Sequence, residues 1–359
     1  MPHGMPTDIS ELIDSGEIKD LEIDDYLLER IRLIDYEYYR TAIHHGINPD
    51  LQYLNRRELL LHNIRRGRLE GRVYNPRILQ YLDPDFYLSA YPELALKDND
   101  DAKKHWLYEG AFQKRAPNSV TKQIMESCIH LFQMGKVGSK SIEMSLRTAA
   151  YTEHIMHLHF ANEMISTYPD CYYSYPEIVG GSPCSISFVT GVREPISRIL
   201  SGWIESTKSH ASTMTLGQIS DLIEDHRSLE MHLEKEIDII TDWFKHKFYC
   251  DLDVYSVPFD HECGFAIISG GRHRLFVYTV ERLDKLWPLL SQFLGHDLQC
   301  IRINKTRDKG TVENQLQKRI STIKFSERII DKAFNNRYAR HFWSTEDIRR
   351  FEKKYSSSS

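Results

Sequence analysis

Two clusters of polar residues in this 359-residue chain have the types and spacing needed to bind an anionic group. The first is a glycine-rich turn with two lysines and two serines, Gly135-Lys136-Val137-Gly138-Ser139-Lys140-Ser141. The apolar run Ser127–Phe132 precedes this turn, and apolar residues at helical spacing follow it from Ile142 onward. The sequence therefore predicts a strand, a tight turn and a helix start, where unpaired backbone N–H groups and the helix dipole favour an anion.

The order of residues separates this turn from the nucleotide triphosphate loop. That loop has a longer spacing before its Gly-Lys-Ser/Thr sequence, whereas here the lysine precedes the second glycine and Val137 follows the lysine. The order Lys136-x-Gly138-Ser139-x-Ser141 instead resembles the 5′-phosphosulfate loop of sulfotransferases that use 3′-phosphoadenosine-5′-phosphosulfate (PAPS). The resemblance implies that Lys136 stabilises the bridging oxygen and that the remaining loop residues bind the 5′-phosphate: Gly135, Val137, Gly138, Ser139, Lys140 and Ser141. Lys140 stands where the family usually has a small residue, so it adds a second cation or points to solvent.

The second cluster lies on another predicted turn from strand to helix. Ser185–Val192 is rich in β-branched and aromatic residues, as strands are, and Pro195 suits the first turn of a helix. Arg193 stands at the end of this strand, and Ser201 lies eight residues later. In PAPS-dependent sulfotransferases, an arginine and a serine at these two places hold the 3′-phosphate, so the resemblance implies that role for Arg193 and Ser201.

A histidine pair lies on a third predicted strand, Glu153–Phe160. Alternation along a strand places His157 and His159 on one face, and a strand beside the first would end at the same crevice. A hydroxyl acceptor must lose its proton, and the near-neutral pKa of histidine suits a general base. The pair is similar to the His-x-His of uronyl 2-O-sulfotransferases, and we favour His159 over His157 because it lies nearer the carboxyl end. Two histidines with no third ligand nearby do not predict a metal site.

Composition describes an ordinary globular chain. Hydrophobic residues make up 41% and charged residues 27%, as in soluble proteins, and a net charge of −5 argues against a nucleic-acid binder. No apolar run approaches the roughly 18 residues of a membrane span, and no signal-peptide core is apparent. The six cysteines lack metal-ligand spacing, so we expect free thiols in a reducing cytoplasm. Animal carbohydrate sulfotransferases commonly carry an N-terminal membrane span. Because no such span is apparent in this sequence, we expect a bacterial, cytoplasmic protein.

Three regions follow one another along the chain. We expect a charged helical region at 1–72, a small helical segment at 73–118 and the sulfotransferase domain at 119–359. In the middle segment, Asp83 is the expected N-cap of a helix and Gly110 is the expected helix stop. It resembles a segment that accompanies bacterial polysaccharide-synthesis enzymes, which implies docking to a substrate or to such proteins. A small packing domain is the alternative.

The C-terminal part extends the resemblance. The predicted strand Arg274–Leu283 and the helical pattern after Tyr338 are similar to those of a bacterial capsular-polysaccharide sulfotransferase-like group. We expect Tyr168–Pro183 to be a loop that walls the acceptor site, and Lys309 to cover the nucleotide from the basic loop Asn304–Gly310. The predicted fold class is therefore α/β, with a P-loop-like parallel sheet flanked by helices (the sulfotransferase fold) after a helical N-terminal region.

The expected reaction transfers a sulfuryl group in line from PAPS to a hydroxyl of a saccharide, such as a capsular polysaccharide, an exopolysaccharide or an oligosaccharide. Catalysis would depend on positioning and electrostatics, with no metal required because Lys136 and the helix terminus supply positive charge. Two alternatives stay open. A P-loop kinase-like phosphotransferase would need a Mg²⁺-binding hydroxyl where Val137 stands, and a non-catalytic nucleotide- or saccharide-binding module would need no base.

Overall fold

The structure is a computed structural model that describes residues 12, 15–16, 18, 31, 33–41, 51, 53–67, 70, 73–149, 155–159, 163–211, 226–245, 252–301, 320 and 322–357. Its contacts divide the chain into two compact units. Unit 1 comprises Met1–Met125 and Tyr168–Gly181, and unit 2 comprises Glu126–Thr167 and Ser182–Ser359. The predicted regions 1–72 and 73–118 both fall in unit 1, whereas 119–359 contributes residues to both units.

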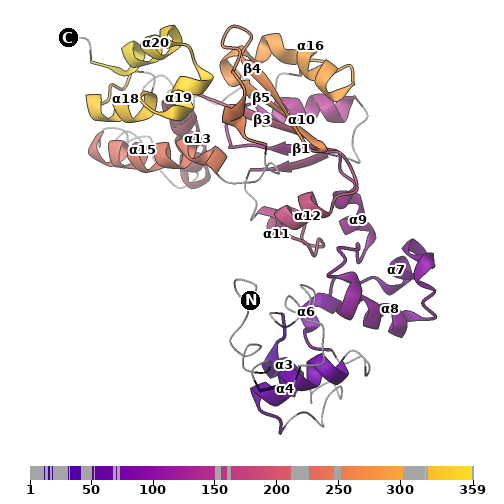
Figure 1. The fold of residues 1–359 in the computed structure, drawn as a ribbon. Coiled ribbons are helices and arrows are strands. Elements are labelled where there is room, and N and C mark those ends of the chain that lie inside the picture. Colours follow the sequence, from indigo (N-terminus) through magenta and orange to yellow (C-terminus); the bar gives the residue numbers. More distant parts are fainter. Residues whose placement is uncertain are drawn as a thin grey trace. The chain divides into compact units, whose positions relative to one another are not determined.

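Unit 2 is built on a five-stranded sheet with the strand order β2-β1-β3-β5-β4 (Figure 1). Its strands are β1 Ile129–Phe132, β2 Ile155–Leu158, β3 Ser187–Val192, β4 Phe265–Gly270 and β5 His273–Thr279. Strands β2, β1, β3 and β5 are parallel, and every residue of β1 and β3 is buried, as is typical of strands with helices on both faces. The prediction of an α/β class with a mostly parallel sheet flanked by helices is confirmed.

The edge strand β4 was not predicted and is antiparallel to β5. The two strands form a hairpin that turns at Gly271, whose φ of 55° lies in the left-handed region that glycine adopts easily. The predicted strand Arg274–Leu283 is therefore too long at its carboxyl end, because the chain turns into the short helix η9 (Val280–Arg282) after Thr279.

Helices cover both faces of the sheet. On one face, α10 (Ser139–Thr148) and α16 (Leu283–Leu294) share a buried apolar cluster with the strands, which includes Leu131, Leu146, Val189 and Leu290. Figure 1 shows the other helices of unit 2 gathered together away from α16: α13 Pro195–Ala211, α15 His226–Thr241, α18 Glu327–Phe334, α19 Arg337–Phe342 and α20 Thr345–Tyr355. Shorter segments of unit 2 are α11 Met164–Thr167, η7 Trp243–Lys245 and η8 Val254–Ser256.

Unit 1 is helical, as predicted for residues 1–118. Its described elements are α3 Tyr36–Thr41, α4 Arg56–His62, η3 Asn63–Gly67, α6 Pro76–Leu79, α7 Pro84–Ala90, η4 Pro92–Leu94, α8 Asn99–His105, η5 Trp106–Gly110, α9 Ser119–Met125 and α12 Tyr175–Gly181. The predicted N-cap and helix stop are both confirmed, because Asp83 accepts a hydrogen bond from the backbone of Phe86 and η5 ends at Gly110.

One arrangement of helices and contacts occurs twice in unit 1. Asp35 precedes α3 and Asp83 precedes α7, and each carboxylate accepts a backbone hydrogen bond at 3.0 Å from the third residue after it. The next residue is a tyrosine in both places. Its hydroxyl lies 2.9 Å from a histidine Nδ1, which pairs Tyr39 with His62 and Tyr87 with His105.

The ends of the two copies also match. The π-helical turns η3 and η5 follow the two histidines and end at Gly67 and Gly110, where a Cβ would crowd the hydroxyl of the tyrosine in the same copy. Asn75 then donates its side-chain amide to the carbonyl of Leu33, and Asn118 donates to that of Tyr81, at 2.9 and 2.7 Å respectively. Residues 33–75 and 81–118 therefore share one helical module in tandem.

The segment Tyr168–Pro183, predicted to be a loop, contains helix α12 and packs within unit 1 up to Gly181. Tyr173 is buried and its hydroxyl lies 2.6 Å from the carbonyl of Arg115 and 3.1 Å from that of Ala111. The Tyr172 ring packs edge-on against Trp106 at 5.3 Å. The prediction of a loop was wrong for Tyr175–Gly181, which forms α12, and the tyrosines before it pack against the second module instead of standing free.

The repeated tyrosine–histidine contact predicts matched effects on stability. Tyr39→Phe and Tyr87→Phe each remove a hydroxyl from a buried histidine contact, so each should lower the free energy of unfolding by about 1 kcal/mol. Urea denaturation checks this, with Tyr53→Phe as a control because Tyr53 is 86% exposed. A loss of stability in only one of the two variants would contradict the equivalence of the modules.

Candidate functional site

The predicted phosphosulfate loop lies where expected, between the carboxyl end of β1 and the first residue of α10. Gly138 has a φ of 80°, and a Cβ there would lie 2.9 Å from the Leu283 side chain, so backbone and packing both require glycine. Lys136 has a φ of 72°, a conformation that costs a residue with a side chain about 1–2 kcal/mol. The loop therefore holds a strained backbone at the position of the predicted catalytic lysine.

Buried polar groups hold this loop in place. The hydroxyl of Tyr278 on β5 donates to the Val137 carbonyl at 2.7 Å and lies 3.1 Å from Gln133 Oε1, which also accepts from the Gly191 backbone at 3.1 Å. Burial raises the pKa of Tyr278 well above its ordinary value, so its hydroxyl stays protonated and can donate. Val137 is fully buried, so the side chain of this predicted cofactor residue cannot face a ligand.

Gly135 differs from the other glycine of the loop. Its φ is not positive, and a Cβ placed on it would meet no atom of the described residues within 4 Å. Neither the backbone nor the packing of the described chain explains a glycine here. Ser139 is buried, Ser141 is half-buried and Lys140 is exposed at the start of α10.

The Arg193 turn meets the Lys136 turn at the same edge of the sheet. Because β1 and β3 are parallel neighbours, their carboxyl ends lie side by side. Arg193 donates from Nη1 to the Lys136 carbonyl at 3.2 Å. Pro195 is the first residue of α13, as predicted, and Ser201 is half-buried in the same helix.

The Lys136 ammonium forms an ion pair with Glu205 of α13. The carboxylate is the more exposed partner, with 54% of its side chain accessible against 26% for the lysine. An exposed pair of this kind contributes at most about 1 kcal/mol. Lys136 can therefore exchange Glu205 for a more strongly charged anion.

A pocket of about 520 Å³ borders Arg193. Its other lining residues come from the start of α13, from η9 and from α20: Glu194, Ser197, Val280, Glu281, Arg350, Phe351 and Lys354. Glu194 is only 1% exposed and accepts a hydrogen bond from the Tyr355 hydroxyl, with Lys354 Nζ at 3.7 Å. The pocket thus combines cationic side chains with a buried carboxylate beside the predicted 3′-phosphate residue.

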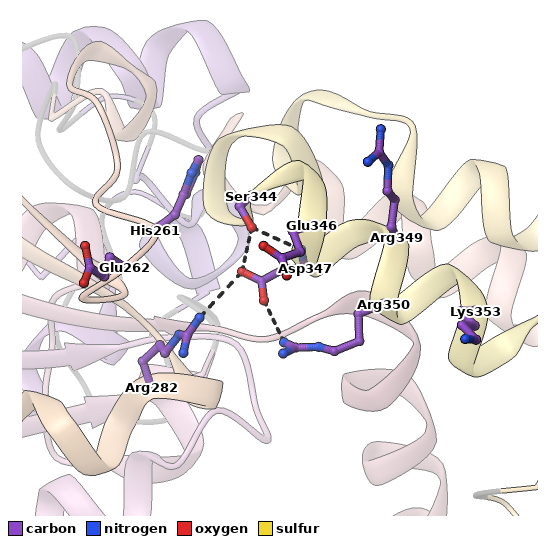
Figure 2. A pocket seen from close by; sticks show the side chains of 9 residues that line it. All are labelled: His261, Glu262, Arg282, Ser344, Glu346, Asp347, Arg349, Arg350 and Lys353. Atoms are coloured by element: carbon purple, nitrogen blue, oxygen red, sulfur yellow. Dashed lines mark hydrogen bonds and ion pairs between the residues drawn. The ribbon is translucent and has the colours of Figure 1, made fainter.

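A second pocket, of about 650 Å³, shares Arg350 with the first and contains none of the predicted site residues (Figure 2). Asp347 lies among its charged side chains, where Figure 2 shows Arg282 and Arg350 directed toward its carboxylate at 3.8 and 2.7 Å. The Ser344 hydroxyl donates to the same carboxylate at 3.0 Å. These contacts fix the start of α20 and satisfy the buried charge of Asp347.

The two histidines lie side by side at the carboxyl end of β2, with ring centroids 5.0 Å apart and ring planes at 75°. His157 Nδ1 lies 2.7 Å from Glu143 Oε2, and Glu143 also accepts two hydrogen bonds from Arg147. His159 Nδ1 lies 3.1 Å from the Gln133 carbonyl. Because a carboxylate and a carbonyl can only accept, both rings carry a proton on Nδ1.

Burial is the main cause that lowers the pKa of His159 below its ordinary 6.5, and the nearby charges of His157 and Lys140 act in the same direction. The bond to the Gln133 carbonyl and the charge of Glu163 oppose this shift of the His159 pKa. His159 is therefore neutral at pH 7, and its Nε2 lone pair can accept a proton.

Three further expectations concern parts of the chain away from these turns. Lys309 lies outside the described residues. Within the part of the chain that the structure describes, no group of three or more histidine, cysteine or acidic side chains could hold a metal ion. No helix in that same part is long and apolar enough to cross a membrane.

Comparison with known proteins adds no relative. No protein-family model, curated protein or solved structure matches this chain. Any activity must therefore be argued from the geometry of the two turns and the histidine pair.

Sequence reasoning missed four residues that shape this site: Gln133, Glu143, Glu205 and Tyr278. Each contacts a partner on a different element, and neither residue spacing nor periodicity indicates such a pairing. Gln133 offered one signal, because a polar side chain directly after the buried strand β1 needs a partner in the core. The signal for Glu143 was its place four residues before Arg147, although this predicts only a pair on the helix surface.

Packing around Gly191 predicts a sharp difference between two glycine variants. A Cβ at Gly191 would lie 2.6 Å from the Tyr278 ring and 2.8 Å from Val137 Cβ, so Gly191→Ala should displace the loop contact and destabilise the protein by about 1–3 kcal/mol. Gly202→Ala is the matched control, because its Cβ would meet no atom of the described residues within 4 Å, and it should stabilise α13 by about 0.5–1 kcal/mol. Urea denaturation measures both, and equal effects would contradict the packing argument.

Proposed function

We propose that this chain is a sulfotransferase, which transfers a sulfuryl group from PAPS to a hydroxyl of a saccharide. The proposal depends on one observation, the hydrogen bond from Arg193 to the Lys136 carbonyl at 3.2 Å. It brings the predicted 5′-phosphosulfate turn and the predicted 3′-phosphate turn together at one edge of the sheet. A single nucleotide with phosphates at both ends of its ribose could then contact both turns.

The 5′-phosphosulfate would lie on the first turn of α10. Backbone N–H groups of that turn and the hydroxyls of Ser139 and Ser141 would bind its phosphate oxygens. No described residue would lie within 4 Å of a Cβ at Gly135, and this supports the placement, because an anion close to the backbone would explain a glycine that the described packing does not require. Lys140, exposed at the same turn, would add a second positive charge.

Arg193 would hold the 3′-phosphate, together with Ser201 one turn beyond Ser197 on the same helix. A guanidinium binds a phosphate through two parallel hydrogen bonds, which a lysine cannot supply. The pocket of about 520 Å³ that Arg193 borders offers room for the adenosine end of the nucleotide. Lys309 belongs to this proposal as a residue that covers the nucleotide, although it lies outside the described residues.

The transfer step assigns one role to His159 and another to Lys136. His159 Nε2 accepts the acceptor hydroxyl proton as the acceptor oxygen bonds to sulfur, and the bond from sulfur to the bridging oxygen breaks. The bridging oxygen leaves with the electron pair on adenosine 3′,5′-bisphosphate, where Lys136 stabilises its developing charge. We assign the base to His159 because His157 Nε2 is buried and has no partner among the described residues, so an acceptor cannot reach it.

The sulfotransferase-type fold, the bacterial cytoplasmic location and the saccharide acceptor form the finer part of this proposal. Support for a saccharide comes from the resemblance of residues 73–118 to a segment found with polysaccharide-synthesis enzymes, which also suggests such enzymes as partners. Val137 argues against a kinase-like phosphotransferase, because its fully buried side chain occupies the place of the Mg²⁺-binding hydroxyl. A non-catalytic module would have no use for a neutral histidine beside the loop.

Transfer of label from radioactive PAPS to a panel of neutral and acidic oligosaccharides tests the activity. The wild-type protein should label at least one acceptor, and Lys136→Ala should reduce kcat by about 10²–10³-fold, as expected for loss of one group that stabilises the leaving charge. Lys285→Ala is the control, because Lys285 is exposed on α16. Equal turnover by wild-type protein and Lys136→Ala would remove this lysine from the mechanism.

The lowered pKa of His159 predicts the pH dependence of transfer. A base acts in its unprotonated form, so kcat/KM should rise with pH through a value below 6.5 and then stay level near neutrality. Replacement His159→Asn should lower kcat by about 10²-fold or more and abolish this rise. A profile that His159→Asn leaves unchanged would show that another group accepts the proton.

A further inference from the structure

Glu143 connects the helix after the phosphate loop with the histidine strand. It lies on α10, and its Oε2 accepts the hydrogen bond from His157 Nδ1 at 2.7 Å. Its other oxygen, Oε1, accepts from Arg147 Nε at 3.0 Å and from Nη2 at 2.8 Å. The carboxylate therefore holds a ring on β2 and a guanidinium on its own helix at the same time.

This arrangement fixes the state of both partners. The hydrogen bond from His157, followed by that from Arg147, lowers the pKa of Glu143 to about 2, so the carboxylate is ionised at neutral pH. An ionised carboxylate accepts hydrogen bonds and donates none. His157 must then keep its proton on Nδ1, and its Nε2 is the buried nitrogen without a partner among the described residues.

The fixed His157 ring packs against His159. The two rings meet edge to face, with centroids 5.0 Å apart, and this contact limits rotation of the second ring. The Gln133 carbonyl holds His159 from the other side through Nδ1 at 3.1 Å, and the His159 backbone N–H donates to Glu163 at 2.6 Å. The charged groups that act on His159 are thus Lys140 on α10 and Glu163 in the segment after β2, with His157 on β2 itself.

We propose that Glu143 is a positioning residue for the base of the transfer reaction, acting through His157 to hold the His159 ring in one orientation. The proposal rests on the sulfotransferase function. Glu143 touches neither the nucleotide nor the acceptor in this arrangement.

A merely structural role would make a different prediction. The pair between Glu143 and Arg147, four residues apart on an exposed helix surface, would suffice for helix stability and is worth about 0.3–0.5 kcal/mol. It would not require a histidine on the neighbouring strand. The contact with His157 is the one that a positioning role needs, and the two contacts can be removed separately.

Two variants separate these contacts. Glu143→Gln keeps the size of the side chain but replaces an obligate acceptor with an amide that can donate or accept, so it removes the tautomer constraint on His157. Arg147→Gln is the matched control, because it removes the helix pair and leaves the His157 contact. Glu143→Asp restores the carboxylate on a shorter side chain and should restore part of any loss.

Nitrogen-15 spectra of the imidazole rings test the constraint without any enzymatic assay. In wild-type protein and in Arg147→Gln, His157 and His159 should both be protonated on Nδ1 near neutral pH. In Glu143→Gln, a signal from the Nε2-protonated tautomer of His157 should appear. Spectra identical to those of the wild-type protein would overturn the proposal.

Transfer from PAPS to a labelled oligosaccharide tests the consequence. Glu143→Gln should lower kcat by about 10–100-fold, the usual effect of removing a group that orients a functional histidine, with little change in KM for PAPS. Arg147→Gln should retain wild-type kcat, and Glu143→Asp should recover part of the loss.

The outcomes distinguish this proposal from the function on which it rests. If the wild-type protein transfers label and Glu143→Gln does so with equal kcat, the positioning role is wrong and the sulfotransferase function stands. If the wild-type protein transfers no label to any acceptor, the sulfotransferase function fails. The tautomer spectra then still decide whether Glu143 constrains His157.

Discussion

Gln133 is the residue on which the geometry of the candidate site depends. It directly follows β1, it is fully buried, and it contacts the three strands that carry the other site residues. Its side-chain oxygen accepts from Gly191 of β3 and lies 3.1 Å from the Tyr278 hydroxyl of β5. Its backbone carbonyl lies 3.1 Å from His159 Nδ1 just beyond β2, and its backbone N–H donates to Leu158. The loop, His159 and the Arg193 strand are therefore held relative to one another through a single buried amide and its peptide groups.

These contacts hold the backbone of the loop in one position but leave the Lys136 ammonium able to change its partner. Tyr278 secures the Val137 carbonyl, so the first turn of α10 is held before any ligand binds. Lys136, in contrast, ends in an ion pair with the exposed carboxylate of Glu205 and can exchange that partner for an incoming anion. The pattern suits group transfer, which requires a fixed geometry for the reacting atoms and a mobile cation that follows the developing charge.

The sequence predicted those parts of the fold that local patterns determine. The apolar runs before Gly135 and Arg193 became β1 and β3, and Pro195 began α13, because burial on both faces and the fixed φ of proline act locally. The sequence pattern did not reveal the tandem module in unit 1, because its two copies share only widely spaced residues and differ in length. His62 stands 23 positions after Tyr39, whereas His105 stands 18 positions after Tyr87. The contacts of Gln133 and Glu143 could not be predicted either, since each joins elements that only the strand order brings together.

Calorimetric titration of the protein with adenosine 3′,5′-bisphosphate, adenosine 5′-monophosphate and ATP with Mg²⁺ tests most directly whether the two turns bind one nucleotide. The account predicts that the bisphosphate binds without a metal, and that the monophosphate, which lacks the group assigned to Arg193, binds at least about tenfold more weakly. Equal affinity for the two adenosine phosphates, or binding of ATP with Mg²⁺ alone, would contradict it.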